Sequence, residues 1–334
     1  TNHRAYLLDS IPEKGQKFKI PFFDPLTLSS RETIITYKGR EKLVIKKRIH
    51  RLHHFESRFS GVRTNFWLDD GGKVIKEESP AGFVFLAEPK FKAVDIEDAG
   101  QELLQAVAVS YSGRLPVEST PEKMEYRLEL PAEVSLDLNG GRQKFEDGSL
   151  RISQEKLSEI NIESSGDGCS DPSDILADIS ASRYVQADHT DIVEHGRQIV
   201  FGNNESLQKV QAIAAWVYDH IDKRPVMGLP DALATLKNRK GDCNEHAALF
   251  AALARSQGIP TRIAAGVTLH QNQFYYHAWN EVCVNSQWLS LDTTKNQIPA
   301  DLTHIRLVYG DLEDQMRIGA VMGKLEIEIL DQKE

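Results

Sequence analysis

The chain has 334 residues, which corresponds to about two domains at roughly 150 residues each. Its 40% hydrophobic and 27% charged residues are ordinary globular proportions, so a packed core is expected and wholesale disorder is excluded. Forty basic against 49 acidic residues give a net charge of −9, which argues against a protein that binds nucleic-acid phosphates. The longest apolar run, residues 247–254, is far below the roughly 20 residues that a transmembrane helix needs, so no membrane span is expected.

The first part of the chain has the pattern of antiparallel β structure. Between residues 33 and 94, β-branched and aromatic residues form short runs that charged or glycine-rich turns separate. The turn at residues 69–72 (DDGG) predicts a hairpin, because aspartate and glycine tolerate the positive φ of tight turns. Apolar and polar residues then alternate over 124–130 and over 134–138, before a turn at 139–141 (NGG). This alternation predicts a second half-buried sheet.

A strongly basic segment lies within the first strand series. Residues 38–63 contain nine Lys and Arg side chains against two acidic ones. We interpret the segment as the solvated edge of a sheet, because edge strands often carry charge that prevents aggregation; a face that binds an anionic partner is the alternative. His50, His53 and His54 belong to the same segment. Positions three apart in a strand point to opposite faces, so we expect solvated histidines rather than a metal cluster.

Residues 163–174 (ESSGDGCSDPSD) mark a predicted domain boundary, because they offer almost nothing to bury and are rich in turn formers. We therefore expect an antiparallel β domain over residues 1–115, a second β segment or subdomain over 116–165, and a last domain over 175–334. The pattern of this last domain is helices followed by antiparallel strands. The fold class predicted for the whole chain is α+β.

The last domain contains the clearest helix signals. Apolar residues recur every three or four positions over 207–221, which predicts a helix with one apolar face, and Trp216 is expected in the core. A short helix is expected over 231–238. The run 247–254 (AALFAALA) is apolar on every side of a helix, so this helix should be the buried centre of the domain. Strands are then predicted over 262–269, 274–284 and 288–292.

One cysteine lies where a thiol can become reactive. Asp242 is a good N-cap residue, which makes Cys243 the first residue of the buried helix, at the positive end of its dipole. A helix N-terminus and a nearby imidazolium lower the pKa of a thiol and so favour a nucleophile. The alternative is that Cys243 is a small packed residue, the usual role of a free cysteine. The chain has three cysteines, so at least one is unpaired. Cys283 is expected to pack, and its pairing with Cys169 stays open.

A base and an orienting group are predicted from the hairpin that follows this helix. If residues 285–286 (NS) form a two-residue turn, His277 and Asp292 lie diagonally across from each other on the same face. The carboxylate can then hold the imidazole in one orientation. A three-residue loop would instead send the two side chains to opposite faces. A zinc site formed by these two residues with Cys243 and His246 is a further alternative.

These motifs together resemble the transglutaminase-like superfamily of papain-related folds. The resemblance rests on Gly-x-Cys at the start of a buried helix, His-Ala-Trp-Asn-Glu-Val on a strand and an Asp that closes the next strand, over roughly residues 206–295. It implies that Cys243 is the nucleophile, His277 the general base and acid, and Asp292 the orienting residue. It also implies acyl transfer that needs no metal or other cofactor.

The function predicted from these residues is cysteine-dependent acyl transfer on peptide or protein amides. We expect hydrolysis rather than crosslinking, because nothing in the sequence marks an amine pocket and water is the default acceptor in an open cleft. A crosslinking transglutaminase, or a non-catalytic module that binds peptides or cell-envelope partners, are the alternatives. The expected partner is a peptide or protein substrate, not nucleic acid, and no oligomeric state is predicted. Bacterial exported proteins often carry β domains ahead of such a domain, so the resemblance favours the periplasm or cell surface.

Overall fold

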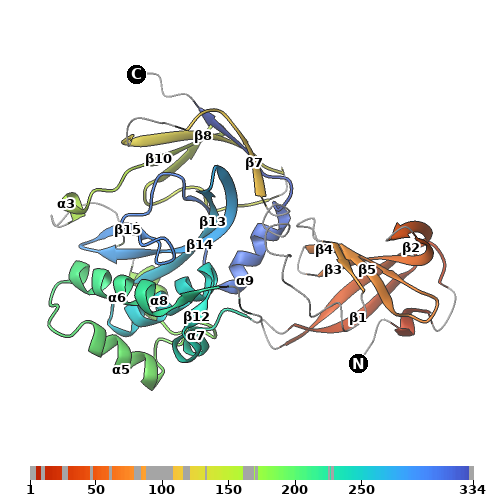
Figure 1. The fold of residues 1–334 in the computed structure, drawn as a ribbon, viewed down its shortest axis with the longest axis horizontal. Helices are drawn as coiled ribbons and strands as arrows, with labels where there is room; N and C mark the ends of the chain where they lie inside the picture. Colours follow the sequence, from red (N-terminus) through yellow and green to blue (C-terminus); the bar gives the residue numbers. More distant parts are fainter. Residues whose placement is uncertain are drawn as a thin grey trace. The chain divides into compact units, whose positions relative to one another are not determined.

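The structure is a computed structural model of the chain, and its arrangement is shown in Figure 1. It describes residues 5–8, 12–24, 29–45, 48–59, 62–78, 84–87, 108–115, 121–131, 134–160, 169, 172–224, 226 and 229–330. The fold class is α+β, as predicted. The chain divides into two compact units, Thr1–Ala108 with Gly319–Gly323 and Val109–Ile318 with Lys324–Glu334. The finer division at residues 115 and 165 stays a prediction.

The first unit contains a six-stranded antiparallel sheet in which each strand pairs with the next along the chain. The sheet packs a small aromatic and aliphatic cluster that includes Ile35, Tyr37, Phe55 and Phe66. The hairpin predicted at residues 69–72 is confirmed, since it joins the fourth strand to the fifth. A short 3₁₀ helix, Ala5–Leu8, precedes the strands. The strands are β1 (Lys17–Asp24), β2 (Ser29–Ile45), β3 (Arg48–Phe59), β4 (Val62–Leu68), β5 (Val74–Glu78) and β6 (Val84–Leu86).

The strands that carry the basic segment are interior strands of the sheet, so the prediction of an edge strand was wrong for the part that neighbouring strands flank. The described residues of the segment form the end of β2, all of β3 and the start of β4. Charge counting could not show this, because the order of strands depends on which segments pair. The solvated interpretation of the histidines was also wrong for two of the three. His53 is only 8% exposed and hydrogen-bonds Tyr37 through Nδ1 at 3.0 Å, and His54 stacks on Trp67.

The second unit is built on a nine-stranded sheet that draws strands from distant parts of the chain. Its order is β16-β13-β14-β7-β17-β8-β10-β9, with β15 paired to β14. The pairing of β17 with β7 is parallel, a departure from the antiparallel sheet that was expected. The strands are β7 (Ala108–Ser112), β8 (Lys123–Glu129), β9 (Gln143–Glu146), β10 (Ser149–Ser153), β13 (Thr261–His270), β14 (Gln273–Val284), β15 (Gln287–Leu291), β16 (Ile305–Tyr309) and β17 (Glu326–Leu330).

One predicted strand does not form. Residues 134–138 are not part of a strand, although their sequence alternates. The buried Arg306 guanidinium donates instead to the carbonyl oxygens of Asp137, Asn139 and Gly140, and it pairs with Glu281 at 3.0 Å. A side chain from β16 thus binds the carbonyl of Asp137 in the expected strand and two carbonyls of the turn that follows it.

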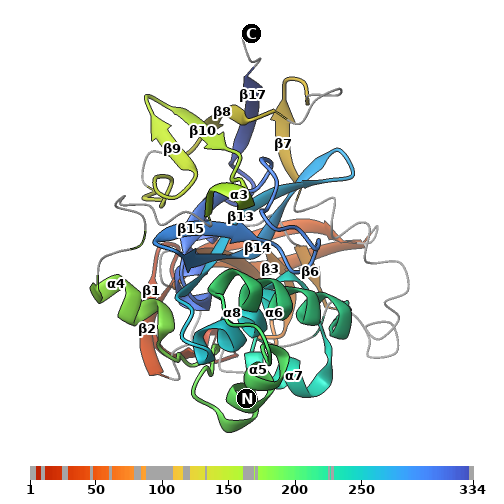
Figure 2. The ribbon, with the colours of Figure 1, turned by 90° about the vertical axis from the view of Figure 1, so that its left-hand side faces the viewer.

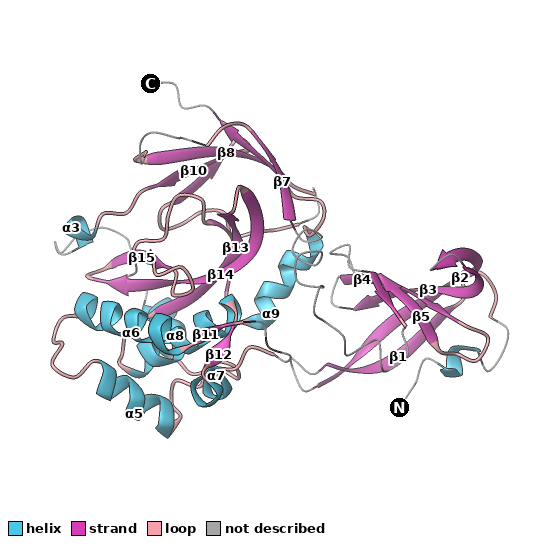
Figure 3. Cartoon of the chain, viewed as in Figure 1, coloured by secondary structure: helices cyan, strands magenta, loops and turns pink. Residues whose placement is uncertain are grey.

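Helices of the second unit gather on one side of its sheet (Figures 2 and 3). The predicted central helix is α8, Cys243–Ser256, which contacts α5, α6 and α7 as well as strands β13 and β14. Because α8 is covered on both sides, its residues from Glu245 to Arg255 are buried, which confirms the prediction of a buried central helix. Trp216 is only half-buried at the margin of this core.

The remaining elements of this unit are α3 (Leu157–Ile160), α4 (Pro172–Ile179), α5 (Thr190–Ile199), α6 (Ser206–His220), β11 (Asp222–Lys223), α7 (Ala232–Asn238), β12 (Lys240–Gly241), α9 (Leu312–Gln315) and the 3₁₀ helix Met316–Ala320. The helices predicted over 207–221 and 231–238 are thus confirmed as α6 and α7. Within the described part of the chain, each helix falls short of the length and hydrophobicity that crossing a bilayer requires.

Cys169 and Cys283 form a disulfide, and Cys243 is the free cysteine. Cys283 was expected to pack while its pairing with Cys169 was left open, and the structure shows that the two are bonded. The bond links the segment before α4 to the end of β14, across a sequence separation of 114 residues. Spacing alone could not identify the pair, because three cysteines allow three pairings.

Candidate active site

The N-terminus of α8 is held by a capping box. Asp242 is the N-cap, and its side chain accepts a hydrogen bond from the backbone N–H of Asn244 at 2.9 Å. Glu245 in turn accepts one from the backbone N–H of Asp242 at 2.9 Å. These bonds satisfy donors that a helix start leaves free. Cys243 is therefore the first residue of the helix, as the sequence predicted, and its side chain is half-buried.

Gly241 is required by the close approach of Glu245 to the backbone. A Cβ at residue 241 would lie 2.3 Å from the Cβ of Glu245, which no side chain could tolerate. The Gly-x-Cys spacing is thus a consequence of how the capping box folds back on the residue before the cap. Burial and the neighbouring Asp242 carboxylate raise the pKa of Glu245 to about 7, because both disfavour a second negative charge at the helix start.

The hairpin that carries the other two predicted residues has the register that the sequence suggested. Asn280 pairs with Leu291 and Val284 with Gln287, so the turn consists of two residues. Both turn residues have positive φ, 50° at Asn285 and 61° at Ser286, as a tight hairpin turn of this length needs. His277 and Asp292 consequently lie on one face of the hairpin, and not on opposite faces.

His277 lies between the thiol and the carboxylate. Its Nε2 atom is 2.8 Å from Oδ2 of Asp292, and its ring is near enough to Cys243 for the thiol to raise its pKa. Burial lowers the pKa of His277, but the charge of Cys243 and the hydrogen bond to Asp292 outweigh burial and raise it to about 9. The structure thus brings together all three residues predicted from the sequence.

Asp292 uses both of its carboxylate oxygens. Oδ1 accepts backbone N–H groups from Thr294 at 2.7 Å and Lys295 at 3.1 Å, while Oδ2 accepts from His277 and from His304 at 3.1 Å. Burial raises the pKa of a carboxyl, but the two imidazoles outweigh it and hold the pKa of Asp292 well below its usual range. Asp292 is therefore an ionised, buried and fully satisfied carboxylate.

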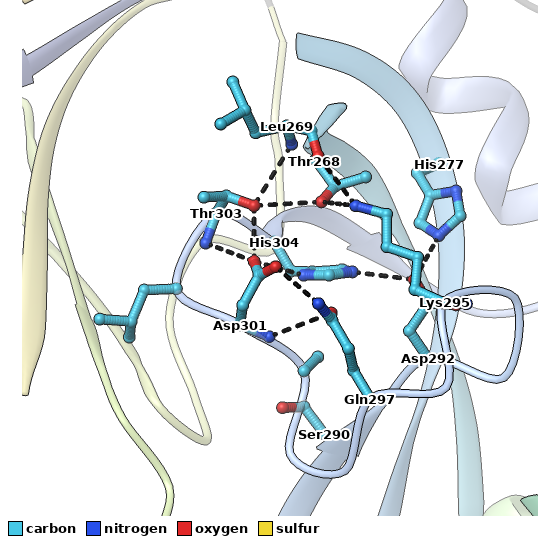
Figure 4. A network of polar contacts seen from close by, with 12 residues as sticks. Thr268, Leu269, His277, Ser290, Asp292, Lys295, Gln297, Asp301, Thr303 and His304 are labelled. Atoms are coloured by element: carbon cyan, nitrogen blue, oxygen red, sulfur yellow. Dashed lines mark hydrogen bonds and ion pairs between the residues drawn. The ribbon is translucent and has the colours of Figure 1, made fainter. Parts of the chain in front are cut away.

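His304 was missed by sequence reasoning. It is fully buried in the loop before β16, and Figure 4 shows its ring between two aspartates. Nε2 faces Asp292 at 3.1 Å, and Nδ1 faces Oδ1 of Asp301 at 3.0 Å. Each ring nitrogen of His304 thus faces a carboxylate oxygen from a different residue. No motif surrounds His304 in the sequence that could have pointed to it.

A polar network anchors this arrangement to the rest of the sheet (Figure 4). Asp301 accepts hydrogen bonds from the backbone N–H of Thr303 at 2.9 Å and from the side chain of Gln297 at 2.9 Å. Lys295 reaches across to the end of β13, where its Nζ donates to Thr268 at 2.8 Å and to the carbonyl of Leu269 at 2.9 Å. The loop from 292 to 304 is thus held at both ends.

The ligand atoms of His277, Asp292 and His304 all lie within 4.8 Å of one another. Two imidazoles and a carboxylate would suit a divalent transition metal. The zinc alternative from the sequence used Cys243 and His246, and neither belongs to this cluster. His246 is fully buried, its Nδ1 lies 2.7 Å from the carbonyl of Asp242, and its Nε2 has no hydrogen-bond partner within the described chain.

Residues 194–293 match the sequence profile of the transglutaminase-like superfamily. A candidate cysteine protease from Cytophaga hutchinsonii aligns over 68% of this chain and 88% of its own, with 17% identity and a TM-score of 0.42. The periplasmic domain of TgpA from Pseudomonas aeruginosa aligns over 57% and 73%, with 17% identity and a TM-score of 0.36. Comparison with curated protein sequences finds no match. The profile ends before His304, so the resemblance to the transglutaminase-like superfamily that the motifs suggested is confirmed for residues 194–293.

Proposed function

We propose that this protein is a cysteine hydrolase that cleaves peptide or protein amides. The observation that carries the proposal is the chain of contacts from the Cys243 thiol through His277 to the buried Asp292. A thiol at a helix N-terminus, an imidazole within hydrogen-bond reach and a carboxylate that orients the imidazole are the parts that nucleophilic acyl transfer needs. The match of residues 194–293 to the superfamily profile supports the same general chemistry.

Each step uses a group that the site holds. His277 takes the proton of Cys243, and the sulfur forms a bond to the carbonyl carbon of the amide, whose oxygen becomes negative. The backbone N–H of Cys243 at the helix start is a suitable donor to this oxygen. The imidazolium then gives its proton to the leaving nitrogen as the C–N bond breaks, which leaves a thioester.

The thioester is resolved by water in the leading form of the proposal. His277 takes a proton from the water as its oxygen attacks the carbonyl carbon, and the C–S bond breaks to release the acid and restore the thiol. An amine in place of water would give crosslinking, but no residue of the described site marks an amine pocket. Asp292 keeps the imidazole in one orientation, and His304 and Asp301 keep Asp292 in place.

Export to the periplasm or cell surface belongs to the same proposal. The disulfide between Cys169 and Cys283 supports it, because such bonds persist in oxidising compartments. The substrate would then be a peptide or protein of the cell envelope or its surroundings.

The proposal is tested by thiol labelling and by amide turnover on the full chain. Cys243 is the free thiol when the disulfide is intact, so iodoacetamide without reductant reports on Cys243 alone. We expect alkylation at pH 6 to 7 about tenfold faster than that of glutathione. His277→Ala should slow it, whereas His220→Ala, at an exposed histidine of α6, should leave it unchanged.

Turnover separates the catalytic interpretation from its alternatives. Casein cleavage should be lost in Cys243→Ala and should fall strongly in Asp292→Asn, in which the thiol stays reachable but the imidazole is no longer held. Incorporation of a fluorescent amine without cleavage would identify a transglutaminase instead. Alkylation of Cys243 no faster than glutathione, with no turnover, would favour the non-catalytic binding module.

A further inference from the structure

The hairpin of β2 and β3 extends beyond both of its neighbours. These two strands pair with each other as far as Ile45 and Arg48, close to the turn. The ladder of β1 along β2 begins only at Thr36, and that of β4 along β3 only at His53. Residues 42–45 and 48–51, which we name the basic tip, therefore lack a flanking strand among the described residues.

The register of the basic tip places four exposed side chains on one face. Lys42 pairs with Arg51, and Val44 pairs with Ile49, two positions nearer the turn. Side chains two residues apart in a strand, and their cross-strand partners, share a face. Val44 is 73% exposed and Ile49 74%, the highest values for aliphatic side chains of this unit among the described residues, and Lys42 and Arg51 are exposed as well.

The basic side chains of the tip differ from those lower in the hairpin, which form ion pairs with acidic side chains. Residues 42–51 contain five Lys and Arg residues and no acidic residue, in a chain whose net charge is −9. Lower in the hairpin, Lys38 and Arg58 each pair with Glu56 at 3.1 Å. Within the described chain, no acidic side chain pairs with the tip residues Lys42, Arg48 or Arg51. Lys42, Arg48 and Arg51 thus lie near the exposed apolar pair without an acidic partner among the described residues.

We propose that the basic tip docks on the surface of a membrane that contains anionic phospholipid. Val44 and Ile49 would enter the boundary between headgroups and acyl chains, and Lys42 and Arg51 would bind the phosphates. Two residues along a strand separate the apolar pair from the cations by about 7 Å, which matches the 5–10 Å to which interfacial apolar side chains are buried. This inference concerns the first unit and does not depend on the proposed amide hydrolysis.

The exposed apolar pair is what favours a lipid surface over a soluble polyanion. Nucleic acid would use the cations but gain little from two aliphatic side chains. A narrow two-stranded projection also offers no groove for a peptide, whereas it can enter a deformable planar surface. Burial of apolar groups and attraction of cations to anionic lipid act together at such a surface.

Vesicle binding by the full chain tests the proposal. We expect binding to phosphatidylcholine vesicles with about 30% phosphatidylglycerol, measured by flotation, and at least tenfold weaker binding to pure phosphatidylcholine. Lys42→Ser with Arg51→Ser should weaken binding to the anionic vesicles by about 25-fold, at about fivefold per cation. Val44→Thr with Ile49→Thr keeps β-branched side chains and should weaken it at least tenfold.

Matched controls come from the second unit. Lys144 and Arg151 are another exposed cross-strand cation pair, but each contacts an acidic residue, and replacing both by serine should leave vesicle binding unchanged. Phe201→Thr, at an 88% exposed apolar side chain, should also have no effect. Unchanged circular dichroism would show that the tip variants are folded.

Four results would overturn the proposal. The first is anionic-vesicle binding that survives both tip variants. The second is equal binding to the two kinds of vesicle. The third is tighter binding to DNA than to vesicles, with no change in Val44→Thr/Ile49→Thr, which would identify a polyanion site. Sedimentation that shows a dimer lost in the same variant, without vesicle binding, would equally reject a membrane in favour of a second copy of the chain.

Discussion

Asp292 is the residue on which the geometry of the candidate site depends most. It is fully buried and charged, so each of its oxygens must be satisfied by donors. Backbone N–H groups hold Oδ1, and two imidazoles hold Oδ2. Four hydrogen bonds prevent the carboxylate of Asp292 from rotating. The carboxylate therefore fixes the orientation of the His277 ring. The reactive geometry is thus set by residues that do not touch a substrate.

Replacement His304→Gln should lower kcat about tenfold to 100-fold with little change in KM. The amide is close to the ring in size but cannot reach both carboxylates as the ring of His304 does, and leaving a buried carboxylate without this partner costs about 1–3 kcal/mol. Steady-state kinetics on the cleaved substrate would check this split. His220→Gln on α6 is the matched control, and a change confined to KM would contradict a positioning role.

Replacement Cys243→Ser should bring the pKa of His277 down from about 9, because serine carries no charge beside the ring. Titration of the imidazole by NMR would measure the shift. The raised pKa also predicts a pH dependence of stability. The contribution should be fully present below the unfolded pKa of about 6.5 and lost as pH rises through about 9, on the order of 3 kcal/mol. An equal pH dependence in the serine variant would show that the thiolate is not its cause.

Among the secondary-structure elements, α8 links the core to the chemistry. Its first residue is the thiol, and the residues that follow fill the space between three helices and the sheet. A shift of the helix along its axis would move the sulfur away from His277. Dense packing on all sides of α8 opposes such a shift, because the side chains of a close-packed core have few alternative positions.

Leu249→Ala in α8 should lower the free energy of unfolding of the second unit by about 2–5 kcal/mol, through lost burial and a cavity. Urea denaturation followed by circular dichroism would measure it. Leu176→Ala on α4 removes the same atoms from a side chain that is 63% exposed, and it should change stability by no more than about 0.5 kcal/mol. Equal effects of the two substitutions would mean that α8 is not the centre of the core.

At the scale of the whole molecule, the disulfide closes a long stretch of the second unit. The segment between Cys169 and Cys283, which are 114 positions apart in the sequence, includes α4 to α8 and β13, and it carries Cys243 and His277. Closing a loop of this length removes about 4–5 kcal/mol of conformational freedom from the unfolded chain in the simplest entropic treatment. Both cysteines belong to the second unit, so the first should not share this stabilisation.

Cys169→Ser with Cys283→Ser should therefore destabilise the second unit by about 2–5 kcal/mol and leave unfolding of the first unit unchanged. Urea unfolding with and without dithiothreitol would test this, because reductant should reproduce the effect in the natural chain and do nothing to the double variant. A loss of stability shared equally by both units would contradict the assignment of the bond to the second one.

The sequence by itself determined the features that depend on near neighbours. The cap at Asp242, the all-apolar helix behind Cys243 and the two-residue turn after Val284 follow from local backbone preferences and hydrophobic period. The turn also places His277 and Asp292 on one face, so most of the candidate site could be predicted. The roles assigned to its three residues stay predictions.

Only the tertiary structure decided the features that join distant segments. His304 reaches Asp292 from a separate loop, Cys283 pairs with Cys169 at a sequence separation of 114, and Arg306 binds the carbonyl of Asp137, where a strand was expected. The interior position of the basic hairpin likewise depends on which strands flank it. Spacing along the chain carries no information about such contacts, because their free energy comes from burying and pairing groups that only the folded chain brings together.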